Sequence, residues 1–197
     1  MRGSGKPMPP PGVPIHYPPP RCERSDPSPA RIVVPLTRLH PDTAAALAPF
    51  GQRVRYVDVS APNAYWELFR DLWRAGEDFI LIEHDVVPRP QTIARFDRCR
   101  ESWCSCSYLW HWKPAYQWIK DREPRVLNAD LGCARFRAEV MAAAPELGDD
   151  AILGEVVENW RPGLPLPYWL VDDVVRAVLL LRRKFVFCQH ERVGHRG

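Results

Sequence analysis

The sequence has no apolar run long enough to cross a membrane, and this absence narrows the class of protein. Its longest apolar stretches, Phe79–Ile82 and residues 177–181, are far shorter than the ~20 residues that span a bilayer. The basic N-terminus is not followed by the apolar segment of a signal peptide. Together these features predict a cytoplasmic protein without a membrane span.

The sequence also lacks a strong excess of either charge and any paired cysteine motif. The net charge is only +3, which provides no clear surface for a nucleic acid. The six cysteines include no CxxC pair. Cys104 and Cys106 are too close in sequence for an ordinary disulfide, and no second pair would complete a zinc site. We expect free thiols in a reducing compartment.

Four familiar functional motifs are missing as well. There is no GxGxxG, no Walker lysine loop, no HExxH and no GxSxG. These absences disfavour dinucleotide-binding, NTPase, zinc-protease and hydrolase functions.

Proline is abundant, and much of it lies in residues 1–30, which include triplets at 9–11 and 18–20. No periodic apolar pattern runs through this segment, so it cannot bury enough surface to offset the entropy of ordering. We predict a disordered, proline-rich tail over residues 1–30 and a single domain over residues 31–197, which is long enough for a hydrophobic core.

Strand-like and helix-like segments alternate through the predicted domain. The expected extended segments are residues 31–37, 54–59, 78–85, 125–130 and 184–188. The expected helices are residues 41–50, 64–75, 91–100, 136–144, 152–160 and 172–183. This alternation predicts an α/β fold, in the form of one Rossmann-like domain with a mainly parallel central sheet.

Polar side chains stand at the ends of these strands. Thr37 ends the first, Asp58 the second, Glu83 and Asp85 the third, and His190 follows the last. Ligands of parallel α/β sheets bind beyond the carboxyl ends of the strands. We therefore expect these five residues to converge on one binding edge.

Glu83 and Asp85 are the first candidates for metal ligands. Residues two apart in a strand point to the same side. Two carboxylates so placed supply the oxygen ligands that Mg²⁺ or Mn²⁺ prefers, and waters and diphosphate oxygens complete the shell. The alternative is an acidic, solvent-exposed strand end without a ligand.

Four segments resemble, in order, motifs of glycosyltransferases with the A-type fold. Residues 79–88 resemble the acid-x-acid strand, although the first acid is a glutamate and not the usual aspartate. Residues 128–136 resemble the glycine-centred turn that precedes a helix near the donor sugar. Residues 169–175 resemble the acidic helix start that supplies the catalytic base of inverting members. His190, with His195 after it, resembles the late histidine that binds the metal or the diphosphate.

The resemblance implies a metal-dependent, inverting, hexosyltransferase-like enzyme that moves a sugar from a UDP- or GDP-sugar to an acceptor hydroxyl. It implies Mn²⁺ or Mg²⁺ bound by Glu83, Asp85 and His190. It implies a donor site that includes Thr37, Asp58, Glu83, Gly132 and Cys133. It also implies that Asp172 or Asp173 is the general base. Asp172 is favoured because its spacing to Val175 and Leu179 gives the helix a consistent inward face.

Several of these assignments have simpler alternatives. Asp172 could cap the N-terminus of a helix, and Asp58 could be a plain turn residue. His195 is a second candidate ligand but lies close to the end of the chain. The six aromatic residues between Trp103 and Trp118 could form a sugar or acceptor platform or belong to the core.

Two other functions compete with glycosyl transfer. One is a non-catalytic module of the same fold that binds a nucleotide or a partner. The other is a nucleotidyltransferase, which can also use paired acids and a metal. The glycine-rich, lysine-containing loop expected after the first strand of a nucleotidyltransferase is missing here.

Overall fold

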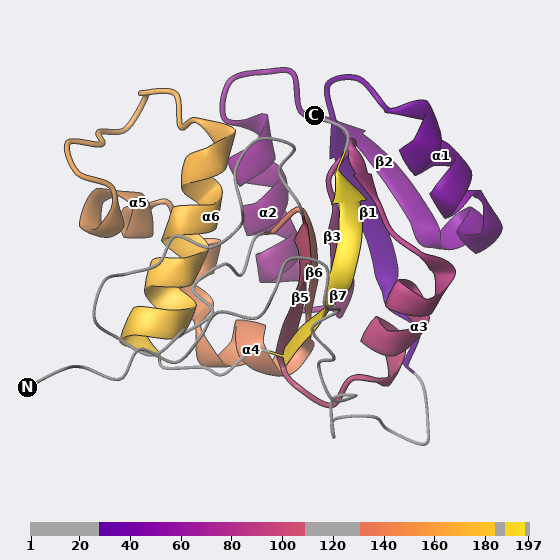
Figure 1. Ribbon diagram of the computed structural model, residues 1–197. Coiled ribbons are helices and arrows are strands. Elements are labelled where there is room, and N and C mark those ends of the chain that lie inside the picture. The colour runs from indigo at the N-terminus through magenta and orange to yellow at the C-terminus, as the bar shows by residue number, and fades with distance from the viewer. Residues whose placement is uncertain (1–27, 109–130, 184–187, 196–197) are drawn as a thin grey trace, which may run out of the picture.

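Seven strands form one mixed sheet in the computed structural model, which describes residues 28–108, 131–183 and 188–195 (Figure 1). The strands are β1 (Arg31–Leu36), β2 (Val54–Asp58), β3 (Phe79–Ile82), β4 (Val86–Val87), β5 (Trp103–Tyr108), β6 (Cys133–Phe136) and β7 (Cys188–His195). Their order across the sheet is β2-β1-β3-β6-β5-β7-β4. The chain is an α/β protein, and this part of the prediction is confirmed.

Helices cover both faces of the sheet, with α2, α5 and α6 on one side and α1 and α3 on the other (Figure 1). The helical segments are α1 (Pro41–Leu47), η1 (Ala48–Arg53), α2 (Ala64–Ala75), α3 (Pro90–Arg98), α4 (Ala138–Ala143), η2 (Pro145–Gly148), α5 (Ala151–Val156), α6 (Tyr168–Arg176) and η3 (Ala177–Arg182). Val33 of β1 packs on the α2 side, whereas Ile32 and Val34 pack on the α1 side. Because both faces are buried, β1 and β3 read as continuous apolar runs.

The expectation of a mainly parallel sheet holds for one half of it only. Strands β2, β1 and β3 are parallel neighbours, and β5 is parallel to β7. Strand β6 is antiparallel to both β3 and β5, and β4 is antiparallel to β7. The described residues therefore form three parallel and three antiparallel pairings.

The antiparallel pairings of β6 involve two strands, β5 and β6, that the sequence pattern did not predict. Phe136 was placed at the start of a helix, but it ends β6, and α4 follows it. Trp103, the first of the six clustered aromatic residues, begins β5 and is fully buried, with its ring 5.9 Å from that of Phe136. Trp103 is therefore a core residue. Residues 109–118, like the extended segment expected at 125–130 and most of the expected tail, lie outside the described residues.

Helix α2 has the boundaries that its apolar spacing predicts. Gly76 ends it in the left-handed conformation, with a φ of 66°, a conformation that glycine adopts without strain. Asn63 precedes it, but its side chain does not cap the helix. Asn63 Oδ1 instead accepts a hydrogen bond from the main-chain N–H of Leu166, which ties the segment before α6 to the start of α2.

Helix α6 begins earlier than predicted. Its first residue is Tyr168, so Asp172 lies inside the helix and not at its N-terminus. The alternative assignment of Asp172 as a helix cap is therefore wrong. A position in the second turn lets the aspartate side chain reach out to another segment.

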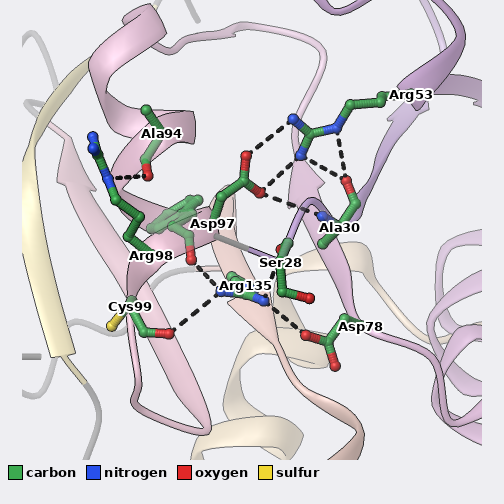
Figure 2. A network of polar contacts seen from close by, with 10 residues as sticks. Ser28, Ala30, Arg53, Asp78, Ala94, Asp97, Arg98, Cys99 and Arg135 are labelled. Atoms are coloured by element: carbon green, nitrogen blue, oxygen red, sulfur yellow. Dashed lines mark hydrogen bonds and ion pairs between the residues drawn. The ribbon is translucent and has the colours of Figure 1, made fainter. Parts of the chain in front are cut away.

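A network of buried charges fixes the edge of the sheet at which β1 and β3 begin (Figure 2). Arg135 of β6 is 1% exposed, and its guanidinium lies 2.7 Å from Asp78 Oδ2. It also donates to the carbonyls of Ser28, Phe96 and Cys99. Strand β6 is thereby joined to the chain before β1, to β3 and to the end of α3.

A second ion pair extends this network. Arg53 donates to both carboxylate oxygens of Asp97, at 3.0 and 2.8 Å, and to the carbonyl of Ala30. Ala30 is 3% exposed, and the main-chain N–H of Ser28 donates to the carbonyl of Asp97. Residues 28–30, which were placed in the tail, therefore belong to the folded domain.

Candidate functional site

The carboxyl ends of β1, β2 and β3 meet at one edge of the sheet, opposite the charged network. The parallel register pairs Leu36 with Asp58 and Val33 with Leu81. Thr37, Asp58 and Glu83, which follow or end these strands, therefore lie along the same edge. We call it the acidic edge. Three of the five residues expected at one binding edge therefore follow or end neighbouring parallel strands at the same edge of the sheet.

Glu83 joins β3 to two other segments at the acidic edge. It is half-buried, and its main-chain N–H donates to the carbonyl of Gly132 at 2.9 Å. Its Oε1 accepts a hydrogen bond from the Tyr65 hydroxyl of α2 at 3.2 Å. Cys133 pairs with Ile82, the residue before Glu83. The antiparallel strand β6 therefore begins beside the end of β3, and this brings Gly132 and Cys133 to the acidic edge.

Asp172 reaches the same place from α6. Its Oδ2 accepts a hydrogen bond from the main-chain N–H of Leu131 at 3.4 Å. Leu131 precedes Gly132, which is bonded to Glu83, so the three predicted residues Glu83, Gly132 and Asp172 surround one short stretch of main chain. Asp173 does not share this position. It is exposed and bonded to Arg176 of its own helix.

The two other predicted donor residues are exposed. Asp58 Oδ1 accepts hydrogen bonds from the main-chain N–H and the hydroxyl of Ser60, at 2.8 and 2.6 Å. These bonds lower the pKa of Asp58. Asp58 thus stabilises the turn after β2, as its alternative assignment predicted. Because Asp58 is exposed, its carboxylate also remains accessible. Thr37 is exposed at the end of β1.

The acid pair does not lie on a strand. Strand β3 ends at Ile82, and the main-chain N–H of Val86 donates to the carbonyl of Glu83 at 3.1 Å, which closes a turn over Glu83, His84 and Asp85. Both carboxylates were expected to point to one side because residues two apart in a strand share a side. Glu83 and Asp85 are not in a strand, so that reasoning is wrong. Glu83 and Asp85 are both half-buried in this turn.

The register of β7 separates the two late histidines. His190 pairs with Cys106 of β5, so β6 and β5 lie between His190 and the end of β3. With ~4.8 Å between neighbouring strands, that separation is about 14 Å along the sheet. His195 pairs with Val86, the residue after Asp85. The backbone therefore brings His195, and not His190, beside the acidic turn.

The donor types at the acidic edge fit a hard divalent cation. Glu83 and Asp85 offer carboxylate oxygens, the ligands that Mg²⁺ and Mn²⁺ prefer. Within the described ranges, no three His, Cys, Asp or Glu side chains gather as a metal-binding group. A cation bound by the two acids would take its other ligands from water and from the phosphate oxygens of a nucleotide.

A pocket of about 230 Å³ lies between α2, α5 and the segment before α6, and none of the predicted site residues lines it. Its lining residues are Asn63, Trp66, Glu67, Arg70, Asp150, Ala151, Leu153, Trp160, Pro162 and Gly163. The sequence pattern did not predict this pocket. The available signal was a stripe of polar and aromatic residues at positions 63, 66, 67 and 70, which share one face of α2.

Asp150 contacts two other side chains of the pocket. Trp66 Nε1 donates to its Oδ1 at 2.7 Å, and Arg70 Nη1 lies 2.8 Å from both of its oxygens. Burial raises the pKa of Asp150, but the hydrogen bonds from Trp66 and Arg70 outweigh burial and hold the pKa below its ordinary value of 3.8.

This lowered pKa predicts an acid-sensitive contribution to stability. A carboxylate whose pKa is lowered by folding stabilises the protein above its unfolded-state pKa, and the contribution is lost as the pH falls through the folded-state pKa. Because the Asp150 side chain is 52% exposed, we expect Asp150→Asn to cost only about 0.5–1 kcal/mol near pH 7. Urea unfolding of both proteins should show this difference shrinking below about pH 4. A difference that grows in acid would contradict the assignment.

No protein-family model, curated protein or solved structure matches the chain. None of the helices in the described ranges is both long and apolar enough to cross a bilayer. The acidic edge and the pocket are therefore the features of the described residues from which a function is inferred.

Proposed function

We propose that the protein is a metal-dependent glycosyltransferase with an A-type fold, which moves a sugar from a UDP- or GDP-sugar to an acceptor hydroxyl with inversion. One observation carries the proposal. Glu83, Gly132 and Asp172, from three distant segments, meet around the main chain of residues 131–132. Each belongs to a different motif of the resemblance, in the roles of metal ligand, donor-site turn and base.

The acidic edge contains the chemical groups that this reaction needs. Glu83 and Asp85 would hold Mn²⁺ or Mg²⁺, which offsets the charge of a leaving nucleoside diphosphate. His195 is a better candidate than His190 for a further ligand, because its backbone lies beside the acidic turn. Asp172 would accept the proton of the acceptor hydroxyl. Thr37 and Asp58 would face the nucleoside.

One observation favours a non-catalytic module that binds a nucleotide or a partner. Within the described ranges, no third His, Cys, Asp or Glu side chain gathers with Glu83 and Asp85 as a metal-binding group. A site with two protein ligands depends on the nucleotide to complete the metal shell, so binding and turnover must be measured separately.

The test is thermal unfolding against a panel of nucleoside diphosphates and nucleotide-sugars, with and without Mn²⁺. At a ligand concentration of ~100 Kd, binding stabilises the native state by about 2.7 kcal/mol. For a domain of this size that is a rise in Tm of about 5–10 °C. We expect one UDP- or GDP-sugar to produce this rise only with Mn²⁺, and Asp85→Asn to abolish it.

Asp71→Asn is the matched control, because Asp71 is an exposed acid on α2 outside the acidic edge. It should keep the full response. Release of nucleoside diphosphate from the stabilising nucleotide-sugar in the presence of acceptor glycosides separates an enzyme from a binding module. A Tm that no nucleotide changes would rule out the donor site.

A further inference from the structure

The pocket between α2 and α5 has the size of a site for one small ring. Its volume of about 230 Å³ lies below the ~300–1,000 Å³ typical of sites for drug-sized ligands. Trp66 and Trp160 both contribute to its wall. Indole side chains offer flat apolar surface on which the C–H face of a ring can stack.

The polar groups of the pocket are held in place before any ligand arrives. Asp150 is fixed by Trp66 and by both of its contacts with Arg70. A carboxylate keeps further acceptor capacity when it is paired in this way. Prior ordering removes part of the entropy that ligand binding otherwise costs. Hydroxyl groups that point to Asp150 would therefore meet a preorganised acceptor.

The charges of the pocket disfavour an anionic ligand. Among the lining residues Arg70 is the cation, and Asp150 neutralises it at 2.8 Å. Glu67 adds an exposed carboxylate at the rim. A phosphate or carboxylate would meet a wall with net negative charge, whereas hydroxyl groups can donate to both acids.

Trp160 adds an unmet hydrogen-bonding requirement. Its Nε1 is buried and has no acceptor among the described residues. A buried N–H group without an acceptor costs free energy. Because the atom is buried, a ligand hydroxyl can accept this hydrogen bond only after the side chains around it move.

We propose that this pocket binds a neutral pyranose, with the ring stacked on Trp160 and its hydroxyl groups bonded to Asp150 and Glu67. The inference is independent of the proposed function, because neither Glu83 nor Asp172 lines the pocket. It assigns the pocket a carbohydrate ligand whether or not the acidic edge binds a nucleotide-sugar.

The first test titrates the full-length, ¹⁵N-labelled protein with methyl glycosides of glucose, galactose, mannose and N-acetylglucosamine. The indole N–H signals of Trp66 and Trp160 should move with at least one glycoside, and those of the core residues Trp73 and Trp103 should not. Methylammonium and inorganic phosphate are the comparison probes. A shift with either of these but with no glycoside overturns the proposal, as does the absence of any shift.

The second test compares two pairs of variants by the same titration. Trp160→Leu should weaken glycoside binding at least about tenfold, through loss of the stacking surface. Trp169→Leu is its control, because Trp169 is 56% exposed and lies outside the pocket. Glu67→Gln should weaken binding about three- to tenfold without affecting the core. Glu77→Gln is its control, because Glu77 is an exposed acid that pairs with Arg31 and lies outside the pocket, and it should have no effect.

Wild-type affinity in Glu67→Gln, or in a folded Trp160→Leu, would overturn the proposal. Because Trp160 also packs against the core, its variant counts only if its spectrum is that of a folded protein. Glu67→Gln remains decisive in either case. Asp85→Asn should keep full glycoside binding, so failure of the donor site and failure of this pocket can be told apart.

Discussion

Replacement of Asp172 by asparagine should lower the rate of sugar transfer by about 10²–10⁴-fold, the usual contribution of a positioned general base. The amide has nearly the same shape as the carboxylate but cannot take the proton of the acceptor. Its oxygen can still accept the hydrogen bond from Leu131, so the segment at residues 131–132 should stay in place. The rate is measured as nucleoside diphosphate released in the presence of acceptor.

The control for this variant is the neighbouring Asp173→Asn. Asp173 is exposed and bonded to Arg176 on the outer side of α6, and surface substitutions of this kind usually change stability by no more than about 0.5 kcal/mol. Its transfer rate should stay close to that of the wild type. Donor affinity, read from the shift in Tm, should be unchanged in both variants. Equal loss of rate in the two would show that α6 supports the site without supplying the base.

The segments that could be predicted from the sequence are those with a clear local signal. The apolar spacing and the terminal Gly76 predicted the boundaries of α2, and the apolar runs of β1 and β3 predicted two buried strands. Their parallel pairing then follows from the alternation of strands and helices. For the same reason the polar ends of β1, β2 and β3 could be assigned to one edge.

The antiparallel strands could not be predicted because their local signal is weak. Strand β6 has four buried residues, Cys133–Phe136, with an arginine among them, so it shows no alternation of apolar and polar residues. Arg135 is compatible with burial only because Asp78 and three main-chain carbonyls surround it, and all of these are distant in sequence. Asp150 poses the same difficulty, since it lies 84 residues from its partner Trp66.

The late histidines show how strand register determines which candidate residue lies beside the acidic turn. Both follow an apolar segment, and the sequence favoured His190 because it stood at the expected strand end. Strand β7 extends to His195, and its last residues pair with β4 beside Asp85. The local sequence pattern does not define where a strand ends or which residue of the neighbouring strand it pairs with. Which histidine lies beside Asp85 therefore follows only from the pairing of β7 with β4.

Replacement of Arg135 by methionine should cost about 3–5 kcal/mol of unfolding free energy, because it leaves the partner charge of a buried ion pair unpaired. Arg135 is 1% exposed, and the Asp78 carboxylate that it contacts also accepts the N–H of Ala138 at the start of α4. For a domain of this size the expected fall in Tm is about 10 °C or more. The measurement is thermal unfolding followed by circular dichroism.

The matched control is Arg31→Met. Arg31 lies at the same end of the sheet and contacts Glu77 at 3.5 Å, but its side chain is 52% exposed. An exposed ion pair contributes less than about 1 kcal/mol. If burial of the charge sets the cost, adding Asp78→Asn to Arg135→Met should recover part of the lost stability, because it removes the unpaired carboxylate. If the hydrogen bonds from Arg135 to main-chain carbonyls dominate, the double variant should be no more stable than Arg135→Met alone. The network would then act chiefly by joining β6 to the start of β1 and the end of α3.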